Sequence, residues 1–491
     1  MLYRKLKVFI LFGFISFLVV SCSKDNESIV TENSVTTNQQ QNNPPPPNRP
    51  GNNNGDGQGG GPNTNIAAEI DNSLTVEWMN LFLELERYAG GMRPNASARA
   101  IAYINLAAYE TAVPGMPTYI SNSRQLQGLN IQDNNINPRN INWEIALNAC
   151  YANVLSHFLL NLPDELTPKI AALEADFEEE LNNGISRQTF DQSKNWGEVV
   201  ARQIIRYSQT DRTAETQVLE PQPLSYEPPT GEGYWTYSAE QERALFPYWE
   251  RVRTFAIAPN QTTTIAPLTY SEDENSPYYQ EMVEVYNANN EARTADGEQL
   301  WIAEFWSDDI EGMMFSPPAR QVSIANQLIV NQDLNLEEGL HLLLKLGFSL
   351  NDAAVSTWKY KYEHMVMRPS VFIQEFMDAS YQTNLYRLIP WPNPTFPGYP
   401  SGHSCFASAA AGVFIDFFGN DINFTDRSHE GRTEFRGAAR TFTSFEEMAT
   451  ENGNSRIPLG VHIRMDCTEG LRLGYEISAG VNSYNVKRNP S

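Results

Sequence analysis

Helical spacing of apolar residues dominates the chain from residue 67 onward. Leu74, Trp78, Leu81 and Leu85 recur three and four positions apart, which places them on one face of a helix. The same period predicts helices over residues 74–88, 95–109, 141–161, 164–182, 187–208, 277–290, 296–309, 319–330, 336–364 and 404–418. Few runs alternate as strands do, so we expect an all-α fold of two packed four-helix-type bundles with long irregular loops.

Residues 210–276 interrupt this pattern with Pro, Thr, Glu and aromatic residues. A long irregular excursion in a compact domain is often a lid or a wall that faces the substrate. No further low-complexity linker follows residue 67, so residues 67–491 are predicted to form one helical domain. Two packed bundles without a flexible joint are the alternative interpretation.

The N-terminus has the pattern of an export signal. Residues 1–22 combine early Lys and Arg residues with the apolar run Val8 to Val20, which is too short to span a bilayer permanently. The segment ending at Cys22 resembles the lipobox of bacterial lipoproteins. This resemblance implies lipidation of Cys22 and anchoring to the outer membrane, facing the periplasm or the outside. A signal that is cleaved without lipidation is the alternative.

Residues 23–66 consist largely of Asn, Gln, Pro, Gly and Thr, with almost no large apolar side chains. Such a segment buries too little surface to offset the entropy of ordering it. We therefore expect a flexible tether that holds residues 67–491 away from the membrane.

Net charge limits the classes of binding partner, and the number of cysteines limits the disulfides that the chain can form. The 491 residues carry a net charge of -24, which argues against nucleic acid and against anionic membrane surfaces, leaving the lipid anchor as the membrane contact. Besides Cys22 the chain has Cys150, Cys405 and Cys467, enough for at most one internal disulfide. A Cys405–Cys467 bridge is conceivable, but we expect buried free thiols.

The first stretch with candidate chemistry runs from Lys361 to Pro369. Lys361 and Arg368 are seven positions apart, so a helix continuing to Arg368 would present both cations on one face, two turns apart. Pro369 is expected to stop that helix. Alone, the pair is typical of a solvated basic face, and His364 within it is predicted to be structural.

The second stretch is Pro400-Ser401-Gly402-His403, at the start of a helix of small residues. The Ser401 hydroxyl and the N–H groups of the next two residues lie where a helix N-terminus binds anions. Gly402 permits close backbone approach, and His403 can act as acid or base beside it. Alone, this stretch could be an ordinary helix cap.

The third stretch contains Arg456, His462 and Asp466. On a helix opening near Gly460, His462 and Asp466 would be i and i+4 neighbours. The carboxylate would hold one ring nitrogen protonated and aim the other outward as a nucleophile or ligand. Arg456, just before that helix, is suited to grip an oxyanion. A core histidine with a satisfied partner is the alternative.

Together the three stretches, from Lys361 to Asp466, resemble the signature of the phosphatidic acid phosphatase type 2 (PAP2) and vanadium-dependent haloperoxidase superfamily. The resemblance implies that vanadate or phosphate is bound through Lys361, Arg368, Ser401, Gly402 and Arg456. It makes His462 the vanadium ligand in a peroxidase, or the phosphoryl-accepting nucleophile in a phosphatase. Asp466 would orient His462, and His403 would be the acid–base group.

Further positions favour the haloperoxidase branch. Trp358 and Phe396 match side chains that line the halide and peroxide pocket in that branch, and Phe at 396 is similar to the chloroperoxidase and iodoperoxidase choice. Residues 306–309 resemble a segment whose last Asp pairs with the second arginine, which implies a contact between Asp309 and Arg456. An ordinary helix C-terminal region is the alternative for this segment.

The expected activity is therefore a vanadate-dependent haloperoxidase, which uses hydrogen peroxide to oxidise a halide to a hypohalous acid-type species that can halogenate an organic acceptor. An acid phosphatase that hydrolyses phosphomonoesters through a phosphohistidine is the alternative. A binding protein that kept the scaffold without catalysis is a third possibility.

Overall fold

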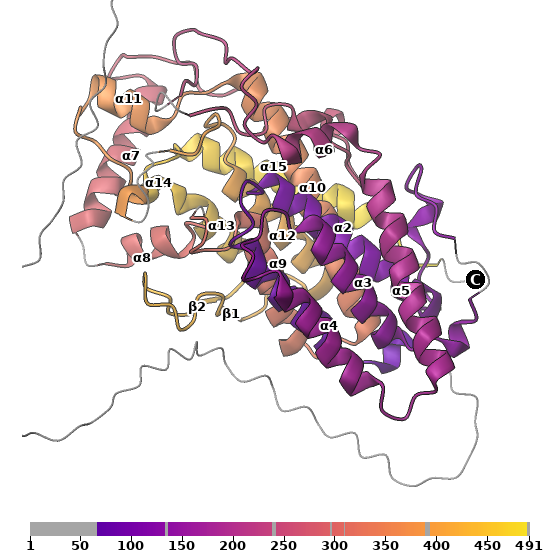
Figure 1. The fold of residues 1–491 in the computed structure, drawn as a ribbon. Coiled ribbons are helices and arrows are strands. Elements are labelled where there is room, and N and C mark those ends of the chain that lie inside the picture. The colour runs from indigo at the N-terminus through magenta and orange to yellow at the C-terminus, as the bar shows by residue number, and fades with distance from the viewer. Residues whose placement is uncertain are drawn as a thin grey trace, which may run out of the picture. The chain divides into compact units, whose positions relative to one another are not determined.

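Helices make up most of the described chain in the computed structural model, which covers residues 66–132, 136–237, 242–294, 297–308, 310–387 and 393–488. The helices are α1 (Ser73–Glu86), α2 (Asn95–Ala112), α3 (Trp143–Phe158), α4 (Pro168–Leu181), α5 (Arg187–Ser208), α6 (Arg212–Leu219), α7 (Pro277–Thr294), α8 (Glu298–Phe305), α9 (Pro317–Asn331), α10 (Leu336–His364), α11 (Pro369–Phe376), α12 (Gly402–Phe418), α13 (Phe445–Asn454), α14 (Arg456–Leu459) and α15 (Arg464–Ser483) (Figure 1). The predicted export signal with Cys22, the tether up to residue 65, and Asp309 lie outside the described residues.

Short elements complete this part of the chain. The 3-10 turns are η1 (Ala67–Glu69), η2 (Val113–Gly115), η3 (Asn122–Arg124), η4 (Pro138–Asn140), η5 (Trp249–Arg251), η6 (Pro259–Gln261) and η7 (Asn384–Arg387). Strands β1 (Phe424–Asp426) and β2 (Arg440–Phe442) form an antiparallel pair in which Thr425 faces Thr441.

The long helices pack as two bundles. In the first, α3 packs against α2, α4 and α5; in the second, α12 packs against α10, α13 and α15 (Figure 1). Helix α10 also packs along α2 and so joins the two bundles. The predicted all-α fold of packed bundles is confirmed.

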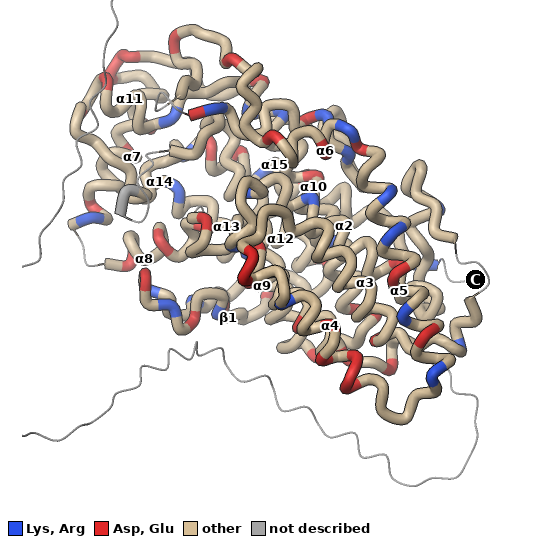
Figure 2. The backbone as a smooth tube through the Cα atoms, viewed as in Figure 1, with Lys and Arg blue, Asp and Glu red and all other residues tan. Residues whose placement is uncertain are grey.

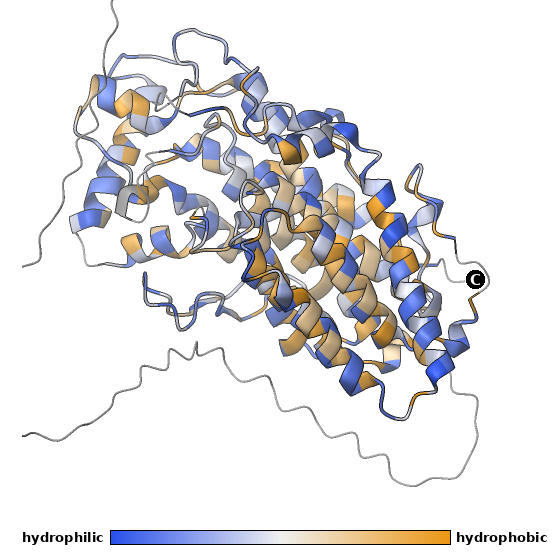
Figure 3. Cartoon of the chain, viewed as in Figure 1, coloured by the Kyte–Doolittle hydropathy of each residue, from blue (hydrophilic) through white to orange (hydrophobic). Residues whose placement is uncertain are grey.

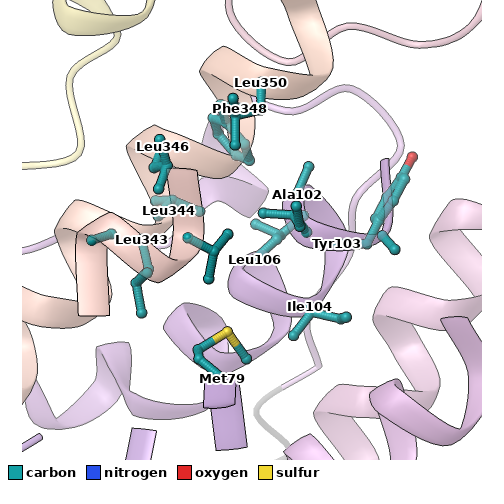
Figure 4. Packing of buried hydrophobic residues seen from close by; sticks show 14 of the residues in the cluster. Met79, Ala102, Tyr103, Ile104, Leu106, Leu343, Leu344, Leu346, Phe348 and Leu350 are labelled. Atoms are coloured by element: carbon teal, nitrogen blue, oxygen red, sulfur yellow. The ribbon is translucent and has the colours of Figure 1, made fainter. Parts of the chain in front are cut away.

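The junction between the bundles is closely packed. Figure 4 shows Leu343 and Leu344 of α10 beside Leu106 of α2 and Met79 of α1. Gly347 allows this approach, because a Cβ there would lie only 2.9 Å from the Cα of Ala102. Large-to-small substitutions in such cores cost about 2–5 kcal/mol, so close packing at this junction is energetically important. The packing thereby fixes the position of α10, the helix that contains Lys361 of the first motif.

Outer helices follow the predicted amphipathic pattern. On α5, Phe190, Trp196, Val200 and Ile204 are buried while the opposite side is hydrophilic (Figure 3). Acidic and basic residues are spread along the outer segments (Figure 2). No helix in the described ranges is both long enough and apolar enough to cross a membrane.

Several predicted boundaries were wrong. Helix α4 begins at Pro168 rather than 164, because Pro168 takes the first helical position, where its missing N–H costs nothing. Helix α8 ends at Phe305 rather than 309. The excursion over residues 210–276 contains α6, whose N-cap Asp211 accepts the N–H of Ala214, so this region is less irregular than predicted.

Candidate active site

The first motif spans a break between two helices. Helix α10 ends at His364, and Met365 follows with a left-handed φ of 52°. The prediction that Lys361 and Arg368 share one helix was therefore wrong. Pro369 does not stop that helix either: it occupies the first turn of α11, with Arg368 at the N-cap.

Lys361 is completely buried at the end of α10. Its Nζ donates to the carbonyl oxygens of Pro397 and Gly398, each at 2.9 Å. Burial, reinforced by the neighbouring charge of Arg368, lowers the pKa of Lys361 well below its usual range. A bound anion would reverse that effect, because it stabilises the charged ammonium.

Arg368 is also fully buried and joins three segments. Its Nε donates to the Phe396 carbonyl at 3.0 Å, and its Nη1 donates to the Val461 carbonyl at 2.9 Å. Nη1 also lies 3.1 Å from Nε2 of His462. The turn at Met365 thus brings the guanidinium to the third motif.

The second motif opens α12, with Gly402 beside Lys361. Ser401 is the N-cap, accepts the N–H of Ser404 at 3.4 Å, and donates its own N–H to the carbonyl of Asp466 at 2.9 Å. A Cβ at Gly402 would lie 3.5 Å from the Trp358 ring and 3.9 Å from Cε of Lys361. The absent side chain therefore leaves space beside the lysine.

His403 is oriented by a backbone carbonyl. Its Nε2 lies 2.9 Å from the oxygen of Ser307, and a carbonyl oxygen can only accept, so Nε2 carries the proton. Nδ1 of the neutral ring then carries the lone pair, which can accept a proton. The predicted acid–base group is thus held in one tautomer.

Arg456 opens the short helix α14 and reaches the same backbone segment. Its Nη1 donates to the carbonyl oxygens of Trp306 and Ser307, each at 3.2 Å. The predicted partner Asp309 lies outside the described residues. Within the described residues, Arg456 contacts the carbonyls of Trp306 and Ser307, the two residues before Asp308 and Asp309.

His462 precedes helix α15, which begins at Arg464, so the prediction that it lies on that helix was wrong. The predicted contact forms nonetheless: Nδ1 donates to Oδ2 of Asp466 at 2.9 Å. This leaves the Nε2 lone pair directed toward Arg368.

Charge in this region favours a neutral imidazole. Burial, followed by the charges of Arg368, Lys361 and Arg456, lowers the pKa of His462 well below its usual range. Burial raises the pKa of Asp466 to about 7, although Lys361 and Arg368 act in the opposite direction. A neutral ring keeps Nε2 as an electron-pair donor.

A cavity of about 410 Å³ opens onto this cluster. Residues singled out from the sequence that line it are Trp358, Phe396, Gly402, His403, Arg456 and His462. The rings of Trp358 and Phe396 have centroids 4.8 Å apart and form one apolar wall. Nζ of Lys361 lies 5.1 Å from the centroid of the Phe396 ring, so the wall adjoins the cations.

Sequence reasoning missed a second group of lining residues: Arg93, Gln222, Glu242, Leu245 and Glu311. Three of them belong to the 210–276 excursion, which agrees with its predicted role as a wall. Leu245 is fixed there because its carbonyl accepts the Trp358 indole N–H at 3.1 Å. The Pro-rich composition marked the segment, but no motif marked these residues.

The three cysteines of the described chain, Cys150, Cys405 and Cys467, are buried free thiols, as predicted. His364 is not among the residues that line the cavity, and its Nε2 contacts the Thr264 hydroxyl at 3.1 Å.

Comparison with known proteins shows what the part of the chain that carries the motifs is similar to. A family model described as the VCPO second helical-bundle domain matches residues 341–488, which include all three motifs. Together with the helical fold, this match supports the resemblance of the three motifs to the vanadium-dependent haloperoxidases over the part of the chain that carries them.

The curated relative that matches is distant in sequence. Vanadium chloroperoxidase from Curvularia inaequalis is 22% identical over 213 residues, which are 33% of this chain and 35% of that protein. The match thus spans about a third of the relative's length.

Two solved structures extend the likeness over most of the chain. The crystal structure of the first bacterial vanadium-dependent iodoperoxidase has a TM-score of 0.73 and 25% identity, covering 86% of this chain and 98% of the other. A holo-type bacterial vanadium-dependent chloroperoxidase has a TM-score of 0.61 and 15% identity, covering 80% and 92%, and shares the fold.

Proposed function

We propose that this protein is a vanadium-dependent haloperoxidase that uses hydrogen peroxide to oxidise a halide to a hypohalous acid-type species. One observation carries the proposal. Three separated segments bring Lys361, Arg368 and Arg456 around His462, whose Nε2 is left as an electron-pair donor by the hydrogen bond from Nδ1 to Asp466.

The residues present fit a vanadate oxyanion. The donors are buried cations and helix N-terminal N–H groups, and the missing side chain at Gly402 leaves space between Trp358 and Lys361. Charge-assisted hydrogen bonds to such donors contribute ~1.5–3 kcal/mol each. His462 would hold the metal through Nε2, and Asp466 would fix the ring.

Vanadate, when bound, would supply a Lewis-acidic centre that activates hydrogen peroxide without changing its own oxidation state. The chain would supply the proton handling. His403, with Nε2 bonded to the Ser307 carbonyl, would take the peroxide proton at Nδ1.

The apolar wall would control what meets the oxidant. Trp358 and Phe396 give the cavity a side with few hydrogen-bonding groups beside Lys361. A large, weakly hydrated halide loses little on leaving water for such a wall. Lys361, on its edge, would keep positive charge near the reacting oxygen.

One assay on the purified apoprotein tests the proposal. Halide-dependent oxidation by peroxide should appear on addition of orthovanadate and should decline as phosphate competes. A phosphomonoester is assayed beside it, with and without vanadate. Hydrolysis of that ester, with no halide oxidation at any vanadate concentration, would establish the phosphatase alternative instead.

We further propose that the protein is exported and lipid-anchored through Cys22. The support is the sequence of residues 1–22, with its basic start, apolar run and lipobox-like end. Labelling of cells with a radioactive fatty acid should mark the wild-type protein and not the Cys22→Ala variant. Release of unlabelled wild-type protein into the soluble fraction would contradict the anchor.

A further inference from the structure

The turn between α8 and α9 supplies two carbonyls to the candidate site. The Ser307 oxygen accepts from Nε2 of His403 and from Nη1 of Arg456, and the Trp306 oxygen accepts from the same Nη1. The direction of these carbonyls therefore decides the tautomer of one side chain and the orientation of another.

The residue after Trp306 and Ser307 has an unusual backbone conformation. Asp308 has a φ of 44°, in the left-handed region that residues other than glycine seldom adopt. Such a conformation persists where the surroundings hold it in place. Asp308 is 1% exposed and also lines the cavity.

Arg320 on α9 holds this residue through its carboxylate. Its Nη2 donates to Oδ1 of Asp308 at 3.0 Å, and its Nε lies 3.3 Å from both carboxylate oxygens. Nη2 also donates to the carbonyl of Phe305. One guanidinium thus grips both ends of the segment 305–308.

A second layer fixes Arg320 itself. Its Nη1 donates to Oδ2 of Asp426 at 3.3 Å, and Nη2 also contacts Nε2 of His429. The guanidinium lies over the rings of Phe305 and Trp306, at 4.7 Å and 5.1 Å from their centroids. All of these partners are buried. The loop after β1 is thereby tied to the back of the turn.

We infer that Asp308 and Arg320 are positioning residues for the reaction: they hold the turn so that the Ser307 carbonyl fixes the His403 tautomer and, with Trp306, the Arg456 guanidinium. The inference rests on the proposed function for the roles of His403 and Arg456. It adds a pair that the three sequence motifs do not contain, and neither residue has to touch the oxyanion.

Two variants test the pair. Asp308→Asn keeps the side-chain size and the tolerance for positive φ while removing the charge; Arg320→Lys keeps the charge while losing the planar fork. Asp426→Asn removes a contact on the far side of Arg320 and should have a smaller effect. Arg99→Lys is the matched control, because Arg99 is a buried arginine on α2 paired with Glu215 at 2.6 Å.

The first readout is binding of inorganic phosphate to the apoprotein by calorimetry. Loss of a group that orients a binding residue costs about 10- to 100-fold in affinity, so Asp308→Asn and Arg320→Lys should weaken phosphate binding by about tenfold or more. Arg99→Lys should bind phosphate within about twofold of wild type, even if its melting temperature falls as much as that of the Asp308 and Arg320 variants.

The second readout is the His403 tautomer, from nitrogen NMR of protein labelled at histidine and assigned with His403→Asn. Wild type should show the Nε2–H form, and both pair variants should show a mixture. Unchanged phosphate affinity and an unchanged His403 signal in Asp308→Asn, with only a lowered melting temperature, would reduce the pair to a structural role. Because neither readout needs halide oxidation, failure of the proposed function is a separate outcome.

Discussion

Two buried clusters of charge, one around Arg320 and one around His462, behave in opposite ways. Around Arg320, cation meets carboxylate: burial opposes ionisation of Asp308, but Arg320 and His429 outweigh it and lower its pKa to about 2. Around His462, burial lowers the pKa of the ring, and the charges of Arg368, Lys361 and Arg456 lower it further, although Asp466 is hydrogen-bonded to the same ring. The first cluster contains two carboxylates beside its cation, whereas the second gathers three cations around one histidine, where a bound anion would be stabilised.

From this comparison we expect the His462 cluster to be needed for activity. We expect the Arg320 cluster to stabilise the fold and to position the turn 305–308. Gathering several buried cations around one histidine costs free energy, which a bound anion would offset. Four experiments test this division.

The largest effect is expected from His462→Ala. Loss of Nε2 should remove vanadate-dependent halide oxidation by at least about 1,000-fold, the upper end of what one electrostatic group contributes. The thermal unfolding curve should also shift to lower temperature, since Oδ2 of the buried Asp466 loses the hydrogen bond from Nδ1. Retention of a tenth of the activity would show that the vanadate is held elsewhere.

Arg320→Met should lower stability in addition to weakening phosphate binding. Removing one partner of a buried ion pair leaves an uncompensated charge and costs about 3–5 kcal/mol; here it strands Asp308 and Asp426. Urea unfolding monitored by circular dichroism measures the difference. A variant as stable as wild type would show that this cluster does not stabilise the fold.

The third experiment is the pH dependence of stability. Burial and the charge of Arg320 lower the pKa of His429 to about 4, while an unfolded histidine titrates near ~6.5. Because the folded pKa is the lower one, the neutral ring stabilises the fold above pH ~6.5 and this contribution is lost as pH falls toward 4, by about 3 kcal/mol. His429→Asn should flatten that slope in urea unfolding measured across the same pH range; an unaltered slope would assign it to other groups.

The smallest expected effect, and the one that most sharpens the comparison, is that of Lys361→Met. Replacing the ammonium with a thioether of similar length should weaken phosphate binding by ~1.5–3 kcal/mol, one charge-assisted hydrogen bond. The apoprotein should become no less stable, because a buried charge with a like-charged neighbour is removed. Calorimetry and unfolding of the same sample decide both points, and a destabilised apoprotein would contradict the account.

Sequence reasoning predicted the members of the His462 cluster but not how the chain brings them together. Lys361 and Arg368 meet their partners through a left-handed turn at Met365 and a new helix at Pro369, rather than along one helix. A proline at a first helical position and one after a last position look alike in sequence. The spacing was informative although the expected local structure was wrong.

His462 gives the complementary lesson. The i and i+4 spacing with Asp466 predicted the contact at 2.9 Å, although His462 lies just outside α15. The extended residue Ile463 still brings the ring over the first turn of the helix, where Asp466 lies. Contacts at a helix N-terminus tolerate such a shift, so the prediction survived an incorrect boundary.

Arg320 and Leu245 could not be found in the sequence. Arg320 acts through partners 12, 106 and 109 positions away, and Leu245 acts through its backbone carbonyl. The residues next to each of them in the sequence look like those around any helix or loop residue. Their roles arise from tertiary packing alone, which periodicity and motifs do not encode.

The most direct test of the central claim is a titration of the purified apoprotein with orthovanadate, followed by halide oxidation with peroxide. The account predicts that activity rises until one vanadate is bound per chain, then stays constant, and that His462→Ala shows neither step. Binding without any halide oxidation, or oxidation that ignores the vanadate added, would contradict it.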